Sequence, residues 1–237
     1  MDRFYFIAIL LIAMMVVCVW AKKLTLPASL AAGLIGFLVF AGAEEKGILM
    51  LVTFFMLSVL ATTHKKNVKA KYHPESLENK GRTTGQVFAN GGIAAILGAL
   101  AVIDHNHSDL YILMMAASLA SALADTLSSE LGIIYGSRFY NILTFKKEAN
   151  GLNGVVSIEG TLIGAAGAFL IAFIYGGFEK KMLIVAIAGI FGNLIDSILG
   201  ATIERKNYIG NNMVNFLNTL LASILAMVLY YAFISIT

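Results

Sequence analysis

Residues 110–127 read LYILMMAASLASALADTL, an apolar run interrupted by a single charged side chain, Asp125. A membrane-spanning helix needs about 17 to 25 mostly apolar residues, because the hydrocarbon core of a bilayer is about 30 Å thick. The run meets that length, and so do, fully or nearly, the segments 4–20, 25–42, 47–63, 86–103, 157–177, 181–200 and 213–235. The sequence therefore predicts an all-α polytopic bundle of about eight transmembrane helices.

The composition fits a single integral membrane domain over residues 1–237. Hydrophobic residues make up 59% of the chain and charged residues 13%, whereas soluble domains carry about 25% charged residues. The net charge of +3, without a basic stripe interleaved with aromatics, argues against nucleic acid as a partner. The single cysteine, Cys18, excludes an internal disulfide, and four loop histidines split between the two faces argue against zinc.

Basic residues are distributed unequally between the two predicted membrane faces. One face collects 13 of the 17 Lys and Arg residues and the three long polar loops, 64–85, 128–156 and 201–212. The positive-inside rule makes this face cytoplasmic. The basic run at 64–71 either acts as a topology signal that meets anionic head groups or helps to attract an anionic substrate. We expect the protein in a bacterial or archaeal cell membrane, with its site on the cytoplasmic side.

Two hairpins of the sequence resemble each other and have the same orientation. The first covers 86–132 and the second 150–204; they follow N-terminal spans at 1–63 and the basic loop, and precede the last loop and span at 205–237. Each hairpin starts near an Asn-Gly pair, and each returning span carries an Asp followed by a hydroxyl residue, Asp125 or Asp196. The pattern predicts a parallel internal repeat.

Two aspartates in apolar helices need an explanation, since each costs about 2.5 to 3.5 kcal/mol at the centre of the membrane on insertion scales. One explanation is that each Asp lies at a helix end and reaches water, but the matched positions of the two residues favour a functional site. Glu130 follows Asp125 closely, with Ser128 and Ser129 between them. Carboxylate and hydroxyl oxygens suit Mg²⁺, which takes one or two carboxylates together with phosphates and water.

The segment 150–157 directly precedes a predicted span and contains Gly151 and Gly154. Its backbone amides and the following helix N-terminus would suit a phosphate, although a plain loop-to-helix turn is the alternative. Gly164 and Gly167 have the spacing of close helix packing. Asn212 and Asn215 share one face of the last span, either as interhelical polar contacts or as site residues.

The chain carries four ordered motifs: Asn90-Gly91-Gly92, residues 120–132, residues 151–157 with Gly160-Thr161, and residues 192–201. Together they resemble the integral membrane family known as domain of unknown function 92, which includes transmembrane protein 19 and the plant phytyl-phosphate kinases. The resemblance covers nearly the whole chain. It implies phosphorylation of an isoprenoid monophosphate to the diphosphate by a nucleoside triphosphate, with CTP favoured, and a distant similarity to dolichol kinases and CDP-diacylglycerol synthases.

The chain departs from the family pattern at two places. It has Thr144-Phe145-Lys146-Lys147-Glu148 where a Pro-Arg element is expected, so Lys146 or Lys147 would replace the arginine as point charges. It has Asn211-Asn212 where many members have Asn-Asp, which removes one carboxylate.

The leading interpretation is a membrane-embedded isoprenoid monophosphate kinase that uses Mg²⁺ and CTP. The alternatives are a cation-coupled transporter or flippase that uses the paired Asp residues, and a non-catalytic lipid-binding or scaffold role. Asp125, Asp196 and Glu130 are the predicted metal ligands and, with Asn193, the predicted catalytic residues. The predicted substrate and nucleotide contacts are Arg82, Asn90, Gly91, Ser128, Ser129, Lys146, Lys147, Asn153, Gly154, Ser157, Thr161, Ser197, Arg205, Asn212 and Asn215.

Overall fold

The computed structural model describes residues 2–72 and 81–233, whose regular secondary structure is helical except for one antiparallel pair of two-residue strands. The predicted all-α membrane bundle is thereby confirmed. Seven of the described helices are long and apolar enough to cross a membrane. The elements are α1 (Asp2–Trp20), α2 (Leu26–Thr63), α3 (Lys66–Lys69), α4 (Thr84–Ile103), η2 (His105–His107), α5 (Ser108–Tyr135), β1 (Tyr140–Asn141), β2 (Val155–Val156), α6 (Ile158–Gly176), α7 (Lys180–Leu199), the π-helical turn η3 (Gly200–Glu204) and α8 (Asn211–Phe233).

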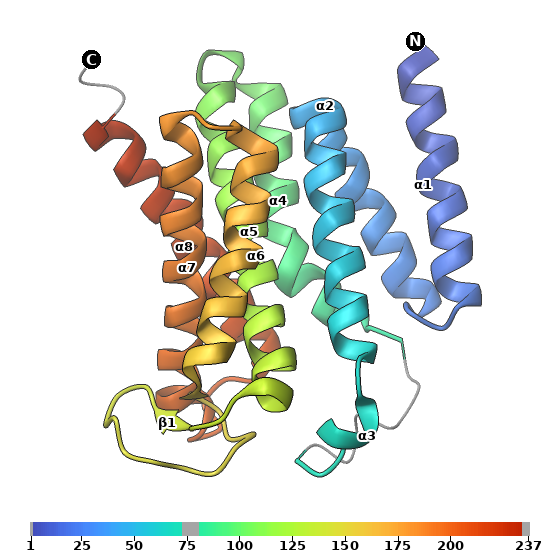
Figure 1. Cartoon of the computed structure of the whole chain (residues 1–237). Coiled ribbons are helices and arrows are strands. Elements are labelled where there is room, and N and C mark those ends of the chain that lie inside the picture. The colour runs from blue at the N-terminus through green and yellow to red at the C-terminus, as the bar shows by residue number, and fades with distance from the viewer. Residues whose placement is uncertain (1, 73–80, 234–237) are drawn as a thin grey trace.

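Helix α2 contains both of the spans expected at 25–42 and 47–63. Glu44, near its middle, has the non-helical angles φ 49° and ψ −143°. Figure 1 shows the two arms of α2 meeting at the upper end and diverging downward, so the chain turns back at Glu44 rather than continuing straight. Arg3 of α1 lies 3.6 Å from Glu45 at this turn. The two expected passes are therefore arms of one kinked element.

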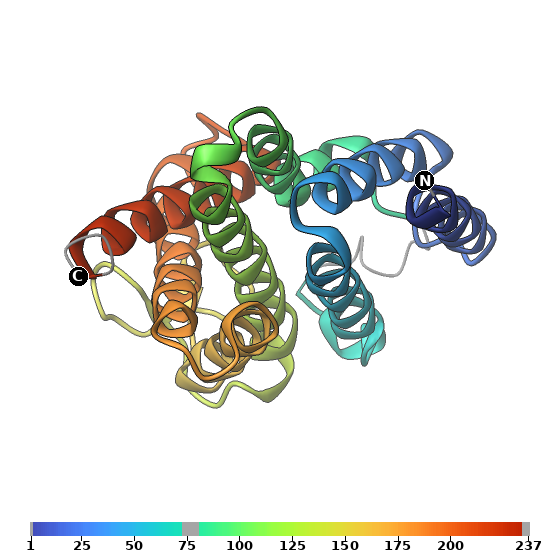
Figure 2. The same ribbon diagram turned by 90° about the horizontal axis from the view of Figure 1, so that it is seen from above.

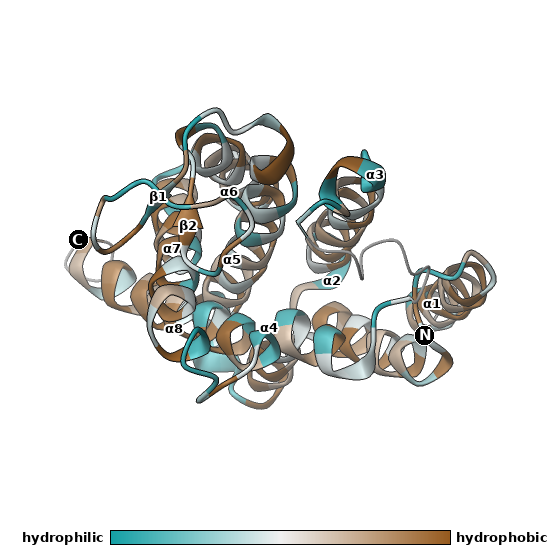
Figure 3. Cartoon of the chain, turned by 90° about the horizontal axis from the view of Figure 1, so that it is seen from below, coloured by the Kyte–Doolittle hydropathy of each residue, from teal (hydrophilic) through white to brown (hydrophobic). Residues whose placement is uncertain are grey.

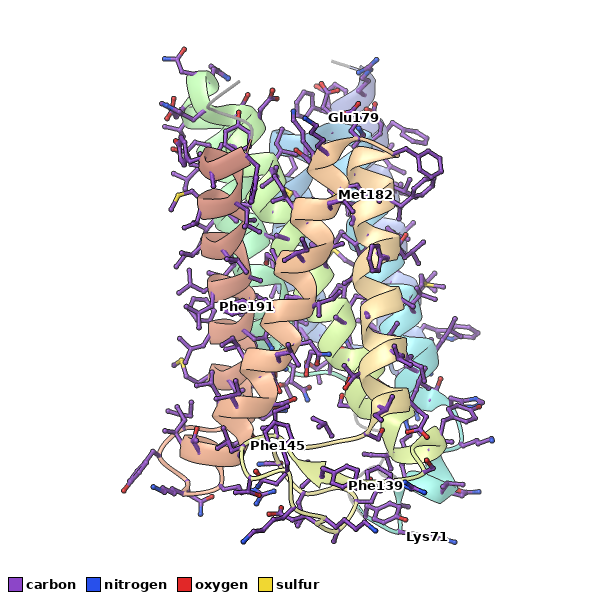
Figure 4. The ribbon with its side chains drawn as sticks, turned by 60° about the vertical axis from the view of Figure 1, so that its left-hand side comes forward. Lys71, Phe139, Phe145, Glu179, Met182 and Phe191 are labelled. Atoms are coloured by element: carbon purple, nitrogen blue, oxygen red, sulfur yellow. The ribbon has the colours of Figure 1, made fainter. Side chains whose placement is uncertain are left out.

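The long connections gather at one end of the bundle, below the helices in Figure 1. Figure 4 places Phe139, Phe145 and Lys71 at this end, and Glu179 and Met182 at the opposite end. We call the first the loop end. It includes the predicted basic loop, of which residues 73–80, with Lys80, lie outside the described part of the chain. The distribution of long and short connections matches the sequence prediction.

Helix α5 is the centre of the bundle and contacts α2, α4, α6, α7 and α8. Every residue from Leu113 to Asp125 is buried, and many of these residues are Ala or Ser. A helix buried on all sides needs small side chains to let its neighbours approach. The apolar run 110–127 is thus the core of the fold, and its single Asp is held inside.

Glycines on α6 permit the closest of these approaches. A Cβ added to Gly164 would lie 2.7 Å from the carbonyl oxygen of Ala124, and one added to Gly167 would lie 2.8 Å from Leu127. Such distances leave no space for a side chain, which confirms the packing interpretation of this glycine pair. The contact sets α6 against the half of α5 that carries Asp125.

The hairpins α4–α5 and α6–α7 place their returning helices, α5 and α7, against each other. The internal repeat itself stays a prediction. Seen from above in Figure 2, α1 stands at the edge of the bundle, beside α2. Seen from below in Figure 3, the outer flanks of the helices are largely apolar, and hydrophilic residues gather at the loop end. This arrangement suits a bundle surrounded by lipid with its polar chemistry at one end.

Candidate functional site

A polar cavity of about 620 Å³ opens at the loop end of the bundle. Helices α2, α4, α5, α7 and α8 contribute to its wall, and the segment 150–157 covers one side. Polar side chains supply most of the chemistry of its lining. They are Thr62, Arg82, Gln86, Asn90, Asp125, Thr126, Ser128, Ser129, Glu130, Asn150, Asn153, Ser157, Asn193, Asp196, Ser197, Glu204, Asn211 and Asn215.

Asp125 and Asp196 lie at the inner part of this cavity with their carboxyl groups against each other. One comes from α5 and the other from α7, which pack together. Asp125 is buried, and Asn193, one helical turn before Asp196, is buried beside it. Two adjacent carboxylates inside a membrane protein repel each other, so this pair favours a bound cation.

A chain of polar groups fixes the orientation of Asp196. The amide nitrogen of Asn218 donates to Asp196 Oδ1 at 2.7 Å, and Ser121 Oγ donates to Asn218 Oδ1 at 3.1 Å. Ser121 and Asn218 are both fully buried. Because the Asn218 oxygen is occupied by Ser121, its amide group is held toward the carboxylate. Asp196 is thus presented to the cavity in a defined position.

Glu130 pairs with Lys69, for which the sequence predicts no role beyond that of the basic run 64–71. Lys69 donates to Glu130 and to two carbonyl oxygens at the end of α2, Ala61 at 2.9 Å and Thr62 at 2.7 Å. Only 3% of Lys69 is exposed. Glu130 still lines the cavity and acts electrostatically on Asp125. Its carboxylate is already partly neutralised, unlike the Asp pair.

Arg82 brings a positive charge to the wall of the cavity. Its backbone is fixed by two hydrogen bonds to the turn before α2, from its N–H to Lys23 O at 2.8 Å and from Thr25 N–H to its carbonyl at 3.1 Å. Burial lowers the pKa of the Arg82 guanidinium, and the carboxylate of Glu130 opposes that shift. An arginine nevertheless keeps its proton in proteins. Arg82 therefore offers a permanent cation to an anionic ligand.

Two asparagine oxygens in the cavity wall are buried and have no hydrogen-bond partner within the described residues, Oδ1 of Asn90 and Oδ1 of Asn215. Asn90 uses its amide nitrogen on Gln86 O at 3.0 Å. Buried polar atoms in native proteins are nearly always hydrogen-bonded. These two acceptors suit donor groups of a ligand, such as sugar hydroxyls, an exocyclic amine or metal-bound water.

The segment 150–157 is held in place by η3. Gly154 has φ 71° and packs against Ala201, while Arg205 donates to Asn153 O and, at 2.7 Å, to Glu148. This hydrogen bond from Arg205 lowers the pKa of Glu148. Ser157 caps α6 by accepting from Gly160 N–H at 3.1 Å. The loop thus faces the cavity with a positive-φ glycine and a helix N-terminus, as a phosphate-binding loop would.

Comparison with known proteins identifies the family of this chain. Residues 9–223 match the family model described as "Integral membrane protein DUF92". The chain belongs to the DUF92 family. It is 33% identical over 231 residues to the uncharacterized membrane protein MJ0933 of Methanocaldococcus jannaschii, covering 93% of this chain and 94% of that protein. No solved structure matches it significantly.

Two plant DUF92 relatives come from Arabidopsis thaliana. The chloroplastic protein VTE6 is 30% identical over 210 residues, which is 84% of this chain and 63% of VTE6. Protein PGR is 31% identical over 250 residues, covering 83% of this chain and 86% of PGR. The family prediction made from the four motifs is confirmed.

The structure of this DUF92 chain gathers most of the predicted site residues, but six lie elsewhere. Gly91 faces an apolar groove instead of the polar cavity. Lys146 and Lys147 are exposed on the loop before β2. Thr161 bonds within α6 to Ser157 O at 3.0 Å, Arg205 acts on the loop as described, and Asn212 packs near Gly85. Their predicted ligand contacts have no support in their placement.

Glu130, the third predicted metal ligand, does not form a three-ligand group with the Asp pair. The described residues contain no group of three or more His, Cys, Asp or Glu side chains arranged to hold a metal ion. A magnesium ion here would therefore have Asp125 and Asp196 as its protein carboxylates, which fits a cation that usually completes its shell with phosphates and water.

Several residues of this DUF92 site were missed from the sequence. Lys69 and Asn218 act on Glu130 and Asp196, and Glu204 and Asn211 line the cavity. The spacing of Asn211, Asn215 and Asn218 follows one helix face, so extending the predicted pair by a turn would have found Asn218. Nothing in the basic run distinguishes Lys69 from its neighbours.

Proposed function

We propose that this protein is a membrane-embedded kinase that transfers a phosphoryl group from a nucleoside triphosphate, CTP in the first place, to an isoprenoid monophosphate. The observation that carries the proposal is the adjacent pair Asp125 and Asp196 inside a polar cavity that also presents Arg82. The similarity to VTE6, together with the resemblance to the plant phytyl-phosphate kinases, supports an isoprenoid phosphate as acceptor.

The reaction needs little covalent chemistry from the protein. An oxygen of the lipid phosphate attacks the γ-phosphorus, the bond from that phosphorus to the β,γ-bridging oxygen breaks, and the nucleoside diphosphate leaves with the bond's electrons. The acceptor is already an anion, so a strong general base is unnecessary. Positioning and charge neutralisation dominate such transfers.

Residues of the cavity can share these tasks. Arg82 neutralises the lipid phosphate, and the segment 151–157 offers backbone donors to the nucleotide phosphates. Magnesium, when held by Asp125 and Asp196, supplies charge neutralisation on the nucleotide. The unpaired oxygens of Asn90 and Asn215 accept hydrogen bonds from the nucleoside or from ordered water. In this proposal none of these groups has to move from its position in the structure to take its role.

The test is transfer of label from γ-labelled CTP, with ATP in parallel, to phytyl, geranylgeranyl and farnesyl monophosphates by purified protein with Mg²⁺. We expect labelled diphosphate, and a loss of at least about a hundredfold in Asp125→Asn and Asp196→Asn, since electrostatic groups at the reacting centre contribute on that scale. Asp109→Asn is the matched control, because Asp109 is exposed at the other end of α5.

Folding of each variant is checked by gel filtration and thermal unfolding in detergent. If folded wild-type protein transfers no label from either donor to any of the three lipids, the kinase proposal is wrong. Flux measurements in proteoliposomes would then test the transporter alternative.

A further inference from the structure

An apolar groove adjoins the polar cavity. It lies between α1, the two arms of α2 and the first half of α4. Arg82, Gln86 and Asn90 line both the groove and the cavity, so the two spaces meet at these residues. The remaining lining is almost wholly apolar: Leu11, Met14, Met15, Cys18, Leu24, Ala32, Gly33, Ile35, Ile48, Leu51, Val52, Phe54, Phe55, Val87 and Gly91.

The groove owes its shape to the turn at Glu44. The arms of α2 meet at the end away from the loops and spread apart toward the loop end, as Figure 1 shows. Glycines let the surrounding helices approach closely: an added Cβ would lie 2.5 Å from Met15 Sδ at Gly33 and 3.2 Å from Ile35 at Gly91. Methionines adapt their shape readily to a flexible apolar chain.

One wall of the groove consists of helix α1, which is exposed over most of its length. Only 6% of the residues in Arg3–Trp20 are buried. Aromatic side chains on α1, including Phe6 and Trp20, are exposed on the outer surface. The outer face of this wall is therefore apolar, as expected for a helix in contact with lipid.

We propose that this groove holds the hydrocarbon tail of the lipid monophosphate, with the phosphate beside Arg82; the identity of the phosphate as acceptor rests on the proposed function. A molecule with one anionic end and one long apolar chain matches a cation placed where an apolar groove meets a polar cavity. A nucleotide has no apolar chain to fill the groove. The tail therefore lies between the α2 arms, and the head enters the cavity toward Asp125 and Asp196.

The native cysteine provides a test that does not depend on transfer. Cys18 lines the groove and is the only cysteine of the sequence. We expect a twenty-carbon prenyl monophosphate at about ten times its Kd to slow maleimide labelling of Cys18 about tenfold, because about a tenth of the sites remain free. CTP or inorganic phosphate should not slow it. Unchanged labelling at a lipid concentration that saturates the protein would overturn the proposal.

A second test uses chain length. Extending the tail from ten to twenty carbons should lower the lipid KM by at least about tenfold, since each buried methylene adds binding. Val52→Phe, which fills the groove, should abolish that gain. Leu49→Phe is the matched control, because Leu49 lies on the same arm and is exposed outside the groove. Equal behaviour of the two variants would count against the groove.

The outcomes separate this proposal from the kinase. Protection of Cys18 without transfer supports the groove and rejects the kinase. Transfer without protection, and with no effect of Val52→Phe on chain-length preference, supports the kinase and rejects the groove. The Cys18 measurement uses the natural sequence, so the proposal remains testable if Val52→Phe does not fold.

Discussion

At the scale of single residues, the site depends on side chains that do not themselves line the cavity. Asn218 holds Asp196, and Lys69 holds Glu130. Both are buried, and both satisfy groups whose charge or lone pairs would otherwise be stranded inside the bundle. The acids could be predicted from their cost in an apolar run, whereas their partners come from distant helices and become visible only in three dimensions.

The contact between Asn218 and Asp196 predicts a positioning role. Removing the amide in Asn218→Ala should lower transfer about 10- to 100-fold and raise the Mg²⁺ concentration needed for half-maximal activity, as loss of groups that orient metal ligands does. Asn212→Ala, which removes an exposed amide on the same helix, should leave both quantities unchanged. A magnesium titration of the transfer rate measures the effect. A lower rate with an unchanged magnesium requirement would argue for a purely structural role.

The contacts of Lys69 predict that its replacement lowers the stability of the protein. In Lys69→Met the cation is lost while Glu130 remains partly buried, and breaking a buried ion pair costs about 3 to 5 kcal/mol. Since 26% of the Glu130 side chain is exposed, we expect about 1 to 3 kcal/mol. Lys71→Met, at an exposed lysine, is the control. Thermal unfolding in detergent measures the loss, and adding Glu130→Gln to Lys69→Met should restore part of it. No recovery in the double variant would show that the carbonyl contacts matter instead.

At the scale of elements, the loop before α6 and the π-helical turn η3 form one unit. Gly154 meets Ala201, and Arg205 connects Asn153 and Glu148. The sequence indicated a glycine-rich turn at a helix start, but the partner of that turn lies about fifty residues later and belongs to a different helix. The local sequence pattern therefore predicts the loop, whereas its partner in η3 becomes visible only in the folded structure.

Gly154 and Gly177 have similar backbone angles φ but different surroundings, so alanine substitutions at the two positions can be compared. Both have positive φ, 71° and 55°, so an alanine at either position adds backbone strain of about 1 to 3 kcal/mol. An added Cβ at Gly177 meets nothing within 4 Å, whereas at Gly154 it collides with Ala201. Gly154→Ala should therefore lose most transfer activity, and Gly177→Ala should lose only stability. Equal activity in the two variants would show that the loop position does not matter to the reaction.

The Glu148–Arg205 pair predicts a pH dependence of stability. The pKa of Glu148 is lowered in the folded protein, so its contribution is present above the ordinary glutamate pKa of 4.5 and is lost as the pH falls below it. Wild type should therefore exceed Glu148→Gln in melting temperature at pH 7, and the difference should close as the pH falls below 4.5. Glu179→Gln, at the opposite end, is the control. A difference that persists in acid would point to packing rather than charge.

At the scale of the whole molecule, hydrophobic runs and loop charges predict the number of passes and the end at which polar residues gather. The kink at Glu44 was not predictable, because the short polar stretch between the arms of α2 reads as an ordinary loop. The convergence of Asp125 and Asp196 was expected from matched positions in two hairpins. The groove beside them depends on how the arms of α2 diverge, and no local pattern contains that angle.

The orientation of the bundle is the last prediction, and the kinase depends on it. Nucleotides are cytoplasmic, so the loop end must face the cytoplasm, as 13 of 17 basic residues indicate. In a Cys18→Ser background, Phe178→Cys at the opposite end should react with a membrane-impermeant maleimide in intact cells, because Phe178 is 92% exposed. Lys147→Cys at the loop end should react only after permeabilisation. The reverse labelling pattern would place the cavity outside the cell, where it could meet no cytoplasmic CTP.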